Sequence, residues 1–252
     1  MISFKRHLLA MGSAIALMAS AAPAFAYTNT AYISQPGSYN TAYQYQGGGN
    51  GNLAITNQYG NYGSASQIQN GNNNYANINQ SGLANIASQT QIGTGNAAFI
   101  IQGGSYNIAS QYQNGSYNRA VIEQGAGGYY SSHNTAHQYQ YGTGNVAGIY
   151  QNGGNGNYAW QLQNGSYNTV MATQSGNYNT SRQAQYGYFN TATVTQSGSY
   201  NTAIQYQSGS SNTATINQPG NHNSATQDQI GTGNIASITQ AGNGNSATQV
   251  QH

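Results

Sequence analysis

Side chains that commonly perform acid–base or nucleophilic chemistry are scarce in this chain of 252 residues. Its only acidic side chains are Glu123 and Asp228, and it has no cysteine. A catalytic pair of carboxyls must share one site, whereas these two lie nearly five 22-residue repeats apart. His133 and His137 are four residues apart, but the sequence places no third metal ligand near them. The residues therefore predict no enzyme activity, no cofactor and no metal site.

The abundant polar groups are amides. The chain contains 35 asparagines and 30 glutamines, whereas only 2% of its residues are charged. An ordinary soluble domain is about a quarter charged, so this composition is exceptional. Arg119 and Arg182 balance the two carboxylates, which leaves no basic face for nucleic acid. Because every side-chain amide both donates and accepts, the chemistry available to this chain is hydrogen bonding between amides.

These amides recur at fixed spacing. The unit N-x-A-x-x-x-Q-x-G-x-x occurs 20 times, starting with Asn in 19 of them and carrying Gln at position 7 in all. Every second unit has another Gln at position 5, so the full period is 22 residues. A disordered polar tract would not confine one residue type to defined positions. The position-7 glutamines are Gln35, Gln46, Gln58, Gln69, Gln80, Gln91, Gln102, Gln113, Gln124, Gln140, Gln151, Gln163, Gln174, Gln185, Gln196, Gln207, Gln218, Gln229, Gln240 and Gln251.

The specified positions 1, 3, 5 and 7 are spaced by two, which is typical of one face of a β-strand. Glycine at position 9 indicates a turn that needs unusual backbone angles. We therefore predict an all-β fold, a β-solenoid of about ten 22-residue coils with two short strands each and amyloid-like cross-β stacking at about 4.8 Å. The position-7 glutamines and the asparagines of the end coils, Asn29, Asn40, Asn234 and Asn245, are expected to form inward ladders that support polymerisation.

The N-terminal segment has the features of a secretory signal peptide. Lys5 and Arg6 precede an apolar run that is shorter than the roughly 20 residues of a membrane-spanning helix. Cleavage is expected between Ala26 and Tyr27. The predicted organisation is thus a signal peptide over 1–26 and a repeat array over 27–252. A five-residue insertion near 127–132 is interpreted as a surface loop, with a hinge as the less favoured alternative.

The two ends of the array lack the atypical repeats that usually cap a solenoid. The first unit, from Asn29, and the last, from Asn245, are as regular as the others. Uncapped ends present unpaired backbone groups that another copy could continue. The sequence therefore predicts a head-to-tail homopolymer.

The alternation of N-x-A-x-I-x-Q-x-G with N-x-A-x-Q-x-Q-x-G resembles the curlin repeat of bacterial curli fibre subunits, and the likeness covers residues 29–252. The resemblance implies a structural subunit, either major or nucleator-like, that is secreted and assembles into extracellular or cell-surface functional amyloid for biofilm matrix, adhesion and aggregation. It also implies two partners, namely a related nucleator or co-subunit and a dedicated outer-membrane export system.

Outward positions allow further interpretations. Aromatic and apolar residues there could form an adhesive or lateral-packing surface, or could simply suit exposed strands. A rival function is a non-polymerising secreted β-solenoid that binds a surface such as ice or polysaccharide through rows of threonine, which would need the same rows in most coils. The outward residues in question are Tyr45, Tyr112, Tyr139, Tyr206, Leu162 and Trp160; the turn tyrosines are Tyr39, Tyr106, Tyr117, Tyr167 and Tyr200; and the threonines are Thr191, Thr193, Thr195, Thr213 and Thr215.

Overall fold

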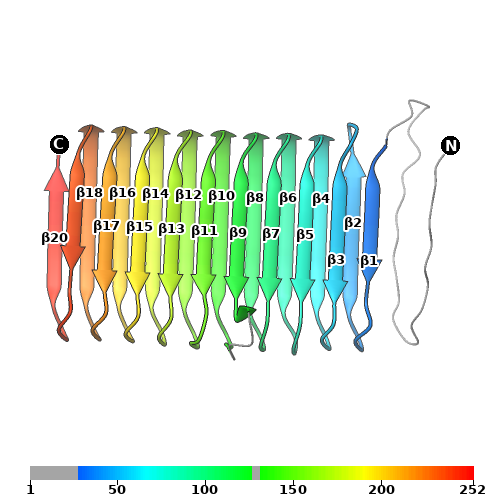
Figure 1. Cartoon of the computed structure of the whole chain (residues 1–252), viewed down its shortest axis with the longest axis horizontal. Helices are drawn as coiled ribbons and strands as arrows, with labels where there is room; N and C mark the ends of the chain where they lie inside the picture. Colours follow the sequence, from blue (N-terminus) through cyan, green and yellow to red (C-terminus); the bar gives the residue numbers. More distant parts are fainter. Residues whose placement is uncertain (1–27, 127–130) are drawn as a thin grey trace.

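The computed structural model describes residues 28–126 and 131–252, and it is an all-β solenoid of ten coils with two strands in each (Figure 1). The predicted signal peptide and its cleavage site at Ala26 and Tyr27 lie outside the described residues, as do residues 127–130 of the insertion. The predicted fold class is therefore confirmed, because alternating inward and outward residues form strands throughout the array.

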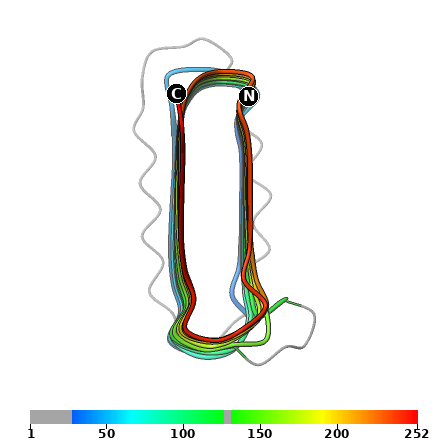
Figure 2. The same cartoon turned by 90° about the vertical axis from the view of Figure 1, so that its left-hand side faces the viewer.

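The strands form two parallel sheets, one of odd-numbered and one of even-numbered strands. Each strand pairs with the strand two places along the chain, so Gln58 lies beside Gln80 and Gln67 beside Gln89. Figure 2 shows the coils superposed end-on as one flattened ring with a sheet on each long side. The odd sheet contains β1 (Thr30–Ser34), β3 (Leu53–Gln58), β5 (Tyr75–Gln80), β7 (Ala97–Gln102), β9 (Arg119–Gln124), β11 (Val146–Gln151), β13 (Thr169–Gln174), β15 (Thr191–Gln196), β17 (Thr213–Gln218) and β19 (Ile235–Thr239). The even sheet contains β2 (Thr41–Gly47), β4 (Ser64–Asn72), β6 (Ile86–Thr94), β8 (Ile108–Ser116), β10 (Thr135–Thr143), β12 (Tyr158–Ser166), β14 (Thr180–Tyr188), β16 (Thr202–Ser210), β18 (Ser224–Thr232) and β20 (Ser246–Gln251).

The apolar core is a narrow column between the sheets. Ile78, Ile100 and Ile122 of the odd sheet are fully buried and belong to one cluster with small residues such as Ala87 and Ala109 of the even sheet. Alanine at position 3 keeps the facing sheet close enough for these contacts. With one large aliphatic side chain in most coils, this core leaves much of the interior to polar groups.

Two physical constraints account for the position-9 glycines, namely a positive φ and the close approach of the next coil. On the even strands the residue lies inside the strand instead of at a turn, and Gly93 and Gly115 have φ of 115° and 135°. At Gly198 and Gly220, which follow odd strands, φ is not in the left-handed region, yet a Cβ there would collide with the carbonyl oxygen of the glycine one coil later. The predicted need for unusual backbone angles therefore holds for the glycines on the even strands, which also approach the next coil closely, and for three glycines that follow odd strands, such as Gly104. At Gly198 and Gly220 close approach between coils is the only reason.

The insertion does not divide the stack. β8 pairs with β10 and β9 pairs with β11 in unbroken register on its two sides. The side-chain Oδ1 of Asn107 accepts a hydrogen bond from the backbone N–H of Asn134 at 3.0 Å, as in uninterrupted coils. The stack is therefore continuous on both sides of the insertion.

Candidate functional site: the amide ladders and their open ends

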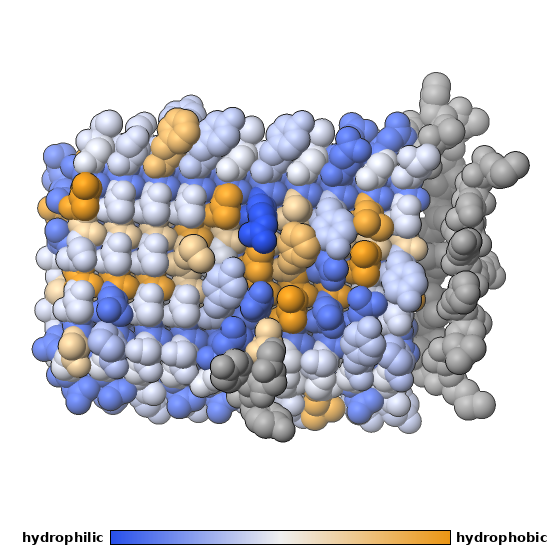
Figure 3. All heavy atoms as spheres, viewed as in Figure 1, coloured by the Kyte–Doolittle hydropathy of each residue, from blue (hydrophilic) through white to orange (hydrophobic). Residues whose placement is uncertain are grey.

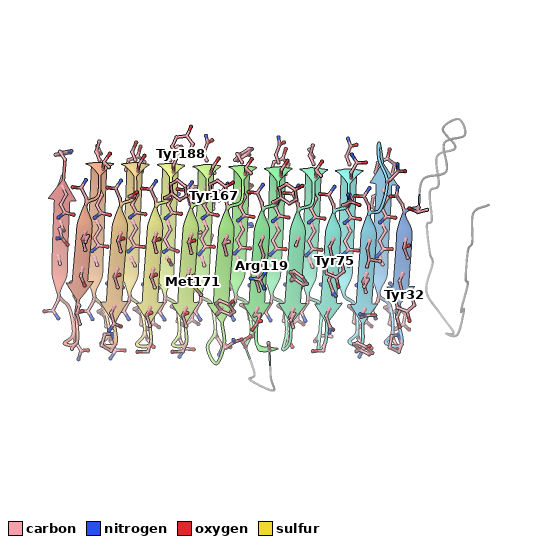
Figure 4. The ribbon with its side chains drawn as sticks, turned by 45° about the horizontal axis from the view of Figure 1, so that its top comes forward. Tyr32, Tyr75, Arg119, Tyr167, Met171 and Tyr188 are labelled. Atoms are coloured by element: carbon pink, nitrogen blue, oxygen red, sulfur yellow. The ribbon has the colours of Figure 1, made fainter. Side chains whose placement is uncertain are left out.

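Three columns of glutamine run through the interior from the first coil to the last. Two consist of the position-7 glutamines of the odd and even strands, and the third consists of the position-5 glutamines of the even strands. In each column Nε2 donates to Oε1 of the glutamine in the next coil, for example from Gln91 to Gln113 at 2.9 Å and from Gln113 to Gln140 at 2.7 Å. The chain linking Gln58, Gln80 and Gln102 is equally regular. Figure 4 shows side chains repeating from coil to coil along the stack.

The second N–H of each amide joins the two sheets. Nε2 of Gln113 also donates to the carbonyl oxygen of Ala97 on the facing sheet, at 3.1 Å. Gln102, from the odd sheet, makes the reciprocal bond to Ile86 of the even sheet at 3.0 Å. A glutamine is therefore bound along the stack and across it, and both partners are needed because the side chain is buried.

Asparagines at position 1 form two further columns beside the turns. Oδ1 of Asn74 accepts from the backbone N–H of Asn96 at 3.0 Å, and Nδ2 of Asn74 donates to the carbonyl oxygen of Gly93 at 2.9 Å. This pattern satisfies backbone groups where each strand begins. The even column is interrupted at Gly63, the one unit without asparagine, where only the backbone N–H continues it.

The glutamine ladders have a direction. Every Nε2 donates toward the C-terminal end, so the first coil retains glutamine Oε1 atoms without a donor among the described residues. One of them, Oε1 of Gln44, is buried and has no hydrogen-bond partner, while the whole residue is 4% exposed. In the last coil, Nε2 of Gln251 donates only to the carbonyl oxygen of Ile235. In the glutamine columns, the N-terminal end therefore offers acceptors and the C-terminal end offers donors.

The structure places the residues singled out from the sequence in two environments. Most position-7 glutamines are buried, as is Asn40. Those that are more open all belong to the end coils, which have a neighbouring rung on one side only. Gln35, Gln46, Gln251, Asn29 and Asn234 are half-buried, and Asn245 is exposed.

A feature that the sequence did not reveal lies at the residue before each repeat asparagine. This position has positive φ at every described turn between units, and 13 non-glycine residues occupy it, Tyr39 and Tyr200 among them. A left-handed conformation costs a non-glycine residue roughly 1–2 kcal/mol. Several of these aromatic rings stack on one another, as Tyr167 does on Phe189 with ring centroids 5.3 Å apart and planes 7° apart. Stacking offsets part of that strain, since an aromatic pair contributes about 0.5–1.5 kcal/mol.

The outer face of the odd sheet changes character along the stack. Toward the C-terminal end it is pale and regular, and toward the N-terminal end it is strongly apolar in places (Figure 3). Thr191 and Thr193 lie in register with Thr213 and Thr215. The row that contains Thr191 ends at Ile235 toward the C-terminal end. Toward the N-terminal end it includes Thr169 and ends at Val146. Threonine rows therefore occupy part of this face and do not span most of the coils.

The even sheet carries the outward strand aromatics that were singled out from the sequence. Tyr139 and Trp160 contact each other with ring centroids 6.3 Å apart, and the guanidinium of Arg182 lies over the Trp160 ring. Burial lowers the pKa of His137 from its usual 6.5. Burial, followed by the neighbouring Tyr112 and Tyr139, raises the pKa of the Tyr141 phenol. Leu162 belongs to the same surface, while Tyr45 and Tyr206 lie at the same outward position nearer the two ends.

Groups that could support other functions are scattered in the part of the chain that the structure describes. Glu123 is on β9 and Asp228 on β18, which belong to different sheets. No three His, Cys, Asp or Glu side chains come together there as a metal site. The described residues also include no helix of the length and apolarity required to cross a membrane.

The fold and interior define a class, a parallel β-solenoid whose coils are joined by internal amide ladders. The family model of the curlin-associated repeat matches residues 190–220, which contain β15, β16 and β17. These residues therefore match the curlin-associated repeat, which supports the repeat family predicted from the sequence. A search of the curated proteins returned no match.

Proposed function

We propose that this protein is a structural subunit that is secreted and assembles head to tail into curli-like extracellular amyloid fibres. The observation that carries the proposal is the directional ladder that starts at Oε1 of Gln44, which is buried and has no hydrogen-bond partner among the described residues. Leaving such an atom unpaired costs about 1–3 kcal/mol. A preceding copy would supply a donor from Gln249, the last glutamine of the same column.

The ends are complementary in one relative orientation only. Two N-terminal ends placed together would oppose glutamine oxygens to glutamine oxygens, whereas an N-terminal end on a C-terminal end continues every ladder. The outer edges of β1, β2, β19 and β20 have no paired strand among the described residues, so their backbone groups would continue in the same way. Such a heterologous contact generates an open filament.

Assembly of the mature chain, residues 27–252, tests this proposal. We expect the purified chain alone to form unbranched fibres in electron micrographs, with a meridional reflection at about 4.8 Å in fibre diffraction. A chain that stays monomeric, or that forms fibres with strands parallel to the fibre axis, would contradict it.

The remaining roles follow from the resemblance and are part of the proposal. The subunit would contribute to biofilm matrix and adhesion at the cell surface, with a related nucleator or co-subunit and an outer-membrane export system as partners. A long lag in assembly that vanishes when a nucleator is added would identify a dependent subunit, and prompt fibre formation a self-sufficient one. Export through the signal peptide predicts that the extracellular protein begins at Tyr27, which N-terminal sequencing would check.

A further inference from the structure

The stacked tyrosines at the turns have a chemical property that fibre assembly does not use. We propose that two pairs, Tyr39 with Tyr62 and Tyr178 with Tyr200, are sites of oxidative tyrosine cross-linking by a haem peroxidase and hydrogen peroxide. Each cross-link would join adjacent coils of one chain. The inference does not depend on polymerisation, because both partners belong to the same molecule.

The geometry of the two pairs favours coupling. The ring centroids of Tyr39 and Tyr62 are 5.0 Å apart with planes 9° apart, and those of Tyr178 and Tyr200 are 5.2 Å apart with planes 18° apart. The backbone holds the partners in place, since the N–H of Tyr62 donates to the carbonyl oxygen of Ser38 at 2.9 Å. Two groups held in contact in this way react as if at very high local concentration.

The four phenols are also open to an oxidant. Their residues are between 53% and 68% exposed, on the outer side of one row of turns. Other tyrosine pairs are arranged differently. Tyr112 and Tyr141 lie 5.5 Å apart with planes at 43°, on the face of a sheet, and both are less exposed than the turn tyrosines.

The reaction balances with peroxide as the oxidant. Each tyrosine loses one electron and its phenolic proton to give a phenoxyl radical. The two radicals form a carbon–carbon bond between ring carbons ortho to oxygen, and the ring hydrogens then move to the oxygens to restore both phenols. The pair loses two electrons and two protons overall, and one hydrogen peroxide takes them up to form two molecules of water.

Such links would supply covalent ties that this chain cannot obtain from disulfides, because it has no cysteine. The pair Tyr39 and Tyr62 joins the first coil to the second, at the end where the first coil has a described neighbour on one side only. A cross-link there would oppose fraying of the end rung.

The experiment treats the full mature chain with a haem peroxidase and hydrogen peroxide under folded conditions and maps cross-linked peptides by mass spectrometry. We expect two dominant intramolecular links, Tyr39–Tyr62 and Tyr178–Tyr200, each with the loss of two hydrogen atoms. Tyr62→Phe and Tyr200→Phe keep the ring stacks and should each reduce one link by about tenfold or more without affecting the other.

The chain offers a matched gain-of-function control. Tyr167 and Phe189 form a third turn stack in which one phenol is missing. Phe189→Tyr should therefore add a third link, to Tyr167. Three results would overturn the proposal: links mainly at Tyr112 and Tyr141, the same distribution of links in denaturant, or no new link in the Phe189→Tyr variant.

Discussion

An interior glutamine side chain of this protein forms hydrogen bonds to three partners. Gln113 binds Gln91, Gln140 and the carbonyl oxygen of Ala97, so it touches the coil before, the coil after and the facing sheet. An apolar side chain of similar size can fill the same volume but can satisfy none of these atoms. The ladder is therefore sensitive to loss of hydrogen bonding more than to loss of packing.

Gln113→Leu should consequently destabilise the folded chain strongly. The change leaves Oε1 of Gln140 and one N–H of Gln91 without partners in a buried site, and it removes the side-chain hydrogen bond to the carbonyl oxygen of Ala97. Unsatisfied buried groups cost about 1–3 kcal/mol each, so we expect the free energy of unfolding to fall by about 3 kcal/mol or more. Guanidinium denaturation at a protein concentration too low for assembly would measure this change in the free energy of unfolding. Gln46→Leu, in the half-buried first coil, is the control and should cost clearly less; equal losses would argue against the ladder's role.

His137 makes the stability of the monomer depend on pH. It lies between Ser110 and Trp160 on neighbouring strands, its Nδ1 is buried without a partner, and burial lowers its pKa below 6.5. The unfolded chain therefore takes up a proton at this side chain before the folded chain does. Stability should be full above pH 6.5 and should fall as the pH drops below that value.

Denaturation midpoints measured across this pH range would check the prediction. His137→Ser, which copies the serine of the preceding rung, should remove most of the pH dependence. The matched change His133→Ser, at an exposed turn residue, should retain it. A pH profile that is unchanged in His137→Ser would show that another group is responsible.

At the scale of the strand and its bends, the position-9 glycines determine how closely coils approach. β8 bends at Gly115, whose φ is 135° and whose Cβ position would collide with the carbonyl oxygen of Gly142. The same carbonyl oxygen accepts from Nδ2 of Asn118 at 2.9 Å. A side chain at this site would therefore disturb two neighbouring rungs.

Gly115→Ala should lower the free energy of unfolding by about 2 kcal/mol or more, through backbone strain and displacement of the next coil. Gly231→Ala isolates the strain, because Gly231 has φ of 116° but no atom nearer than 3.4 Å to the Cβ position. Thermal unfolding of the two variants as monomers would compare their losses of stability. If both substitutions cost the same, close approach between coils would not be the reason for glycine.

The elements were predictable because one face of every strand repeats the same residue types. Spacing by two defined the strands, and the 22-residue period defined which residues lie in register, as Gln67 and Gln89 do. The turns were harder to predict. Tyrosine gives no signal of positive φ, so the left-handed geometry at Tyr39 and its stack on Tyr62 came from the structure alone.

The direction of the glutamine ladders also could not be predicted from the sequence. Glutamine carries its donor and acceptor on one carbon, and the residue type does not state which of them faces the next coil. The orientation depends on the facing sheet, whose carbonyl oxygens, such as that of Ala97, fix the second N–H of each amide. Only when both sheets are placed does Gln44 emerge as the residue with an unpartnered buried oxygen.

At the scale of the whole molecule, the ten coils have the geometry of one segment of a longer stack (Figure 1). The rungs are spaced by about 4.8 Å and the glutamine ladders run without a break from the first coil to the last, so a second copy could continue them with no change of geometry. Fibre growth should therefore be sensitive to any group that projects beyond the last rung, even where the monomer tolerates it.

Gly242→Ala is the sharpest test of this expectation. In the monomer its Cβ position has one close neighbour, Nδ2 of the exposed Asn245 at 3.0 Å. In a fibre Gly37 of the next copy would follow Gly242 in the same column, so the added methyl group would meet a carbonyl oxygen there, as a Cβ at Gly220 would meet that of Gly242. We expect elongation of preformed seeds, followed by dye fluorescence, to slow by about tenfold or more, which corresponds to roughly 1.4 kcal/mol at the junction. Ser246→Ala, which changes an exposed residue of the same last coil, is the control and should elongate normally. Normal elongation by a folded Gly242→Ala variant would mean that the fibre does not grow by continuing this end of the stack.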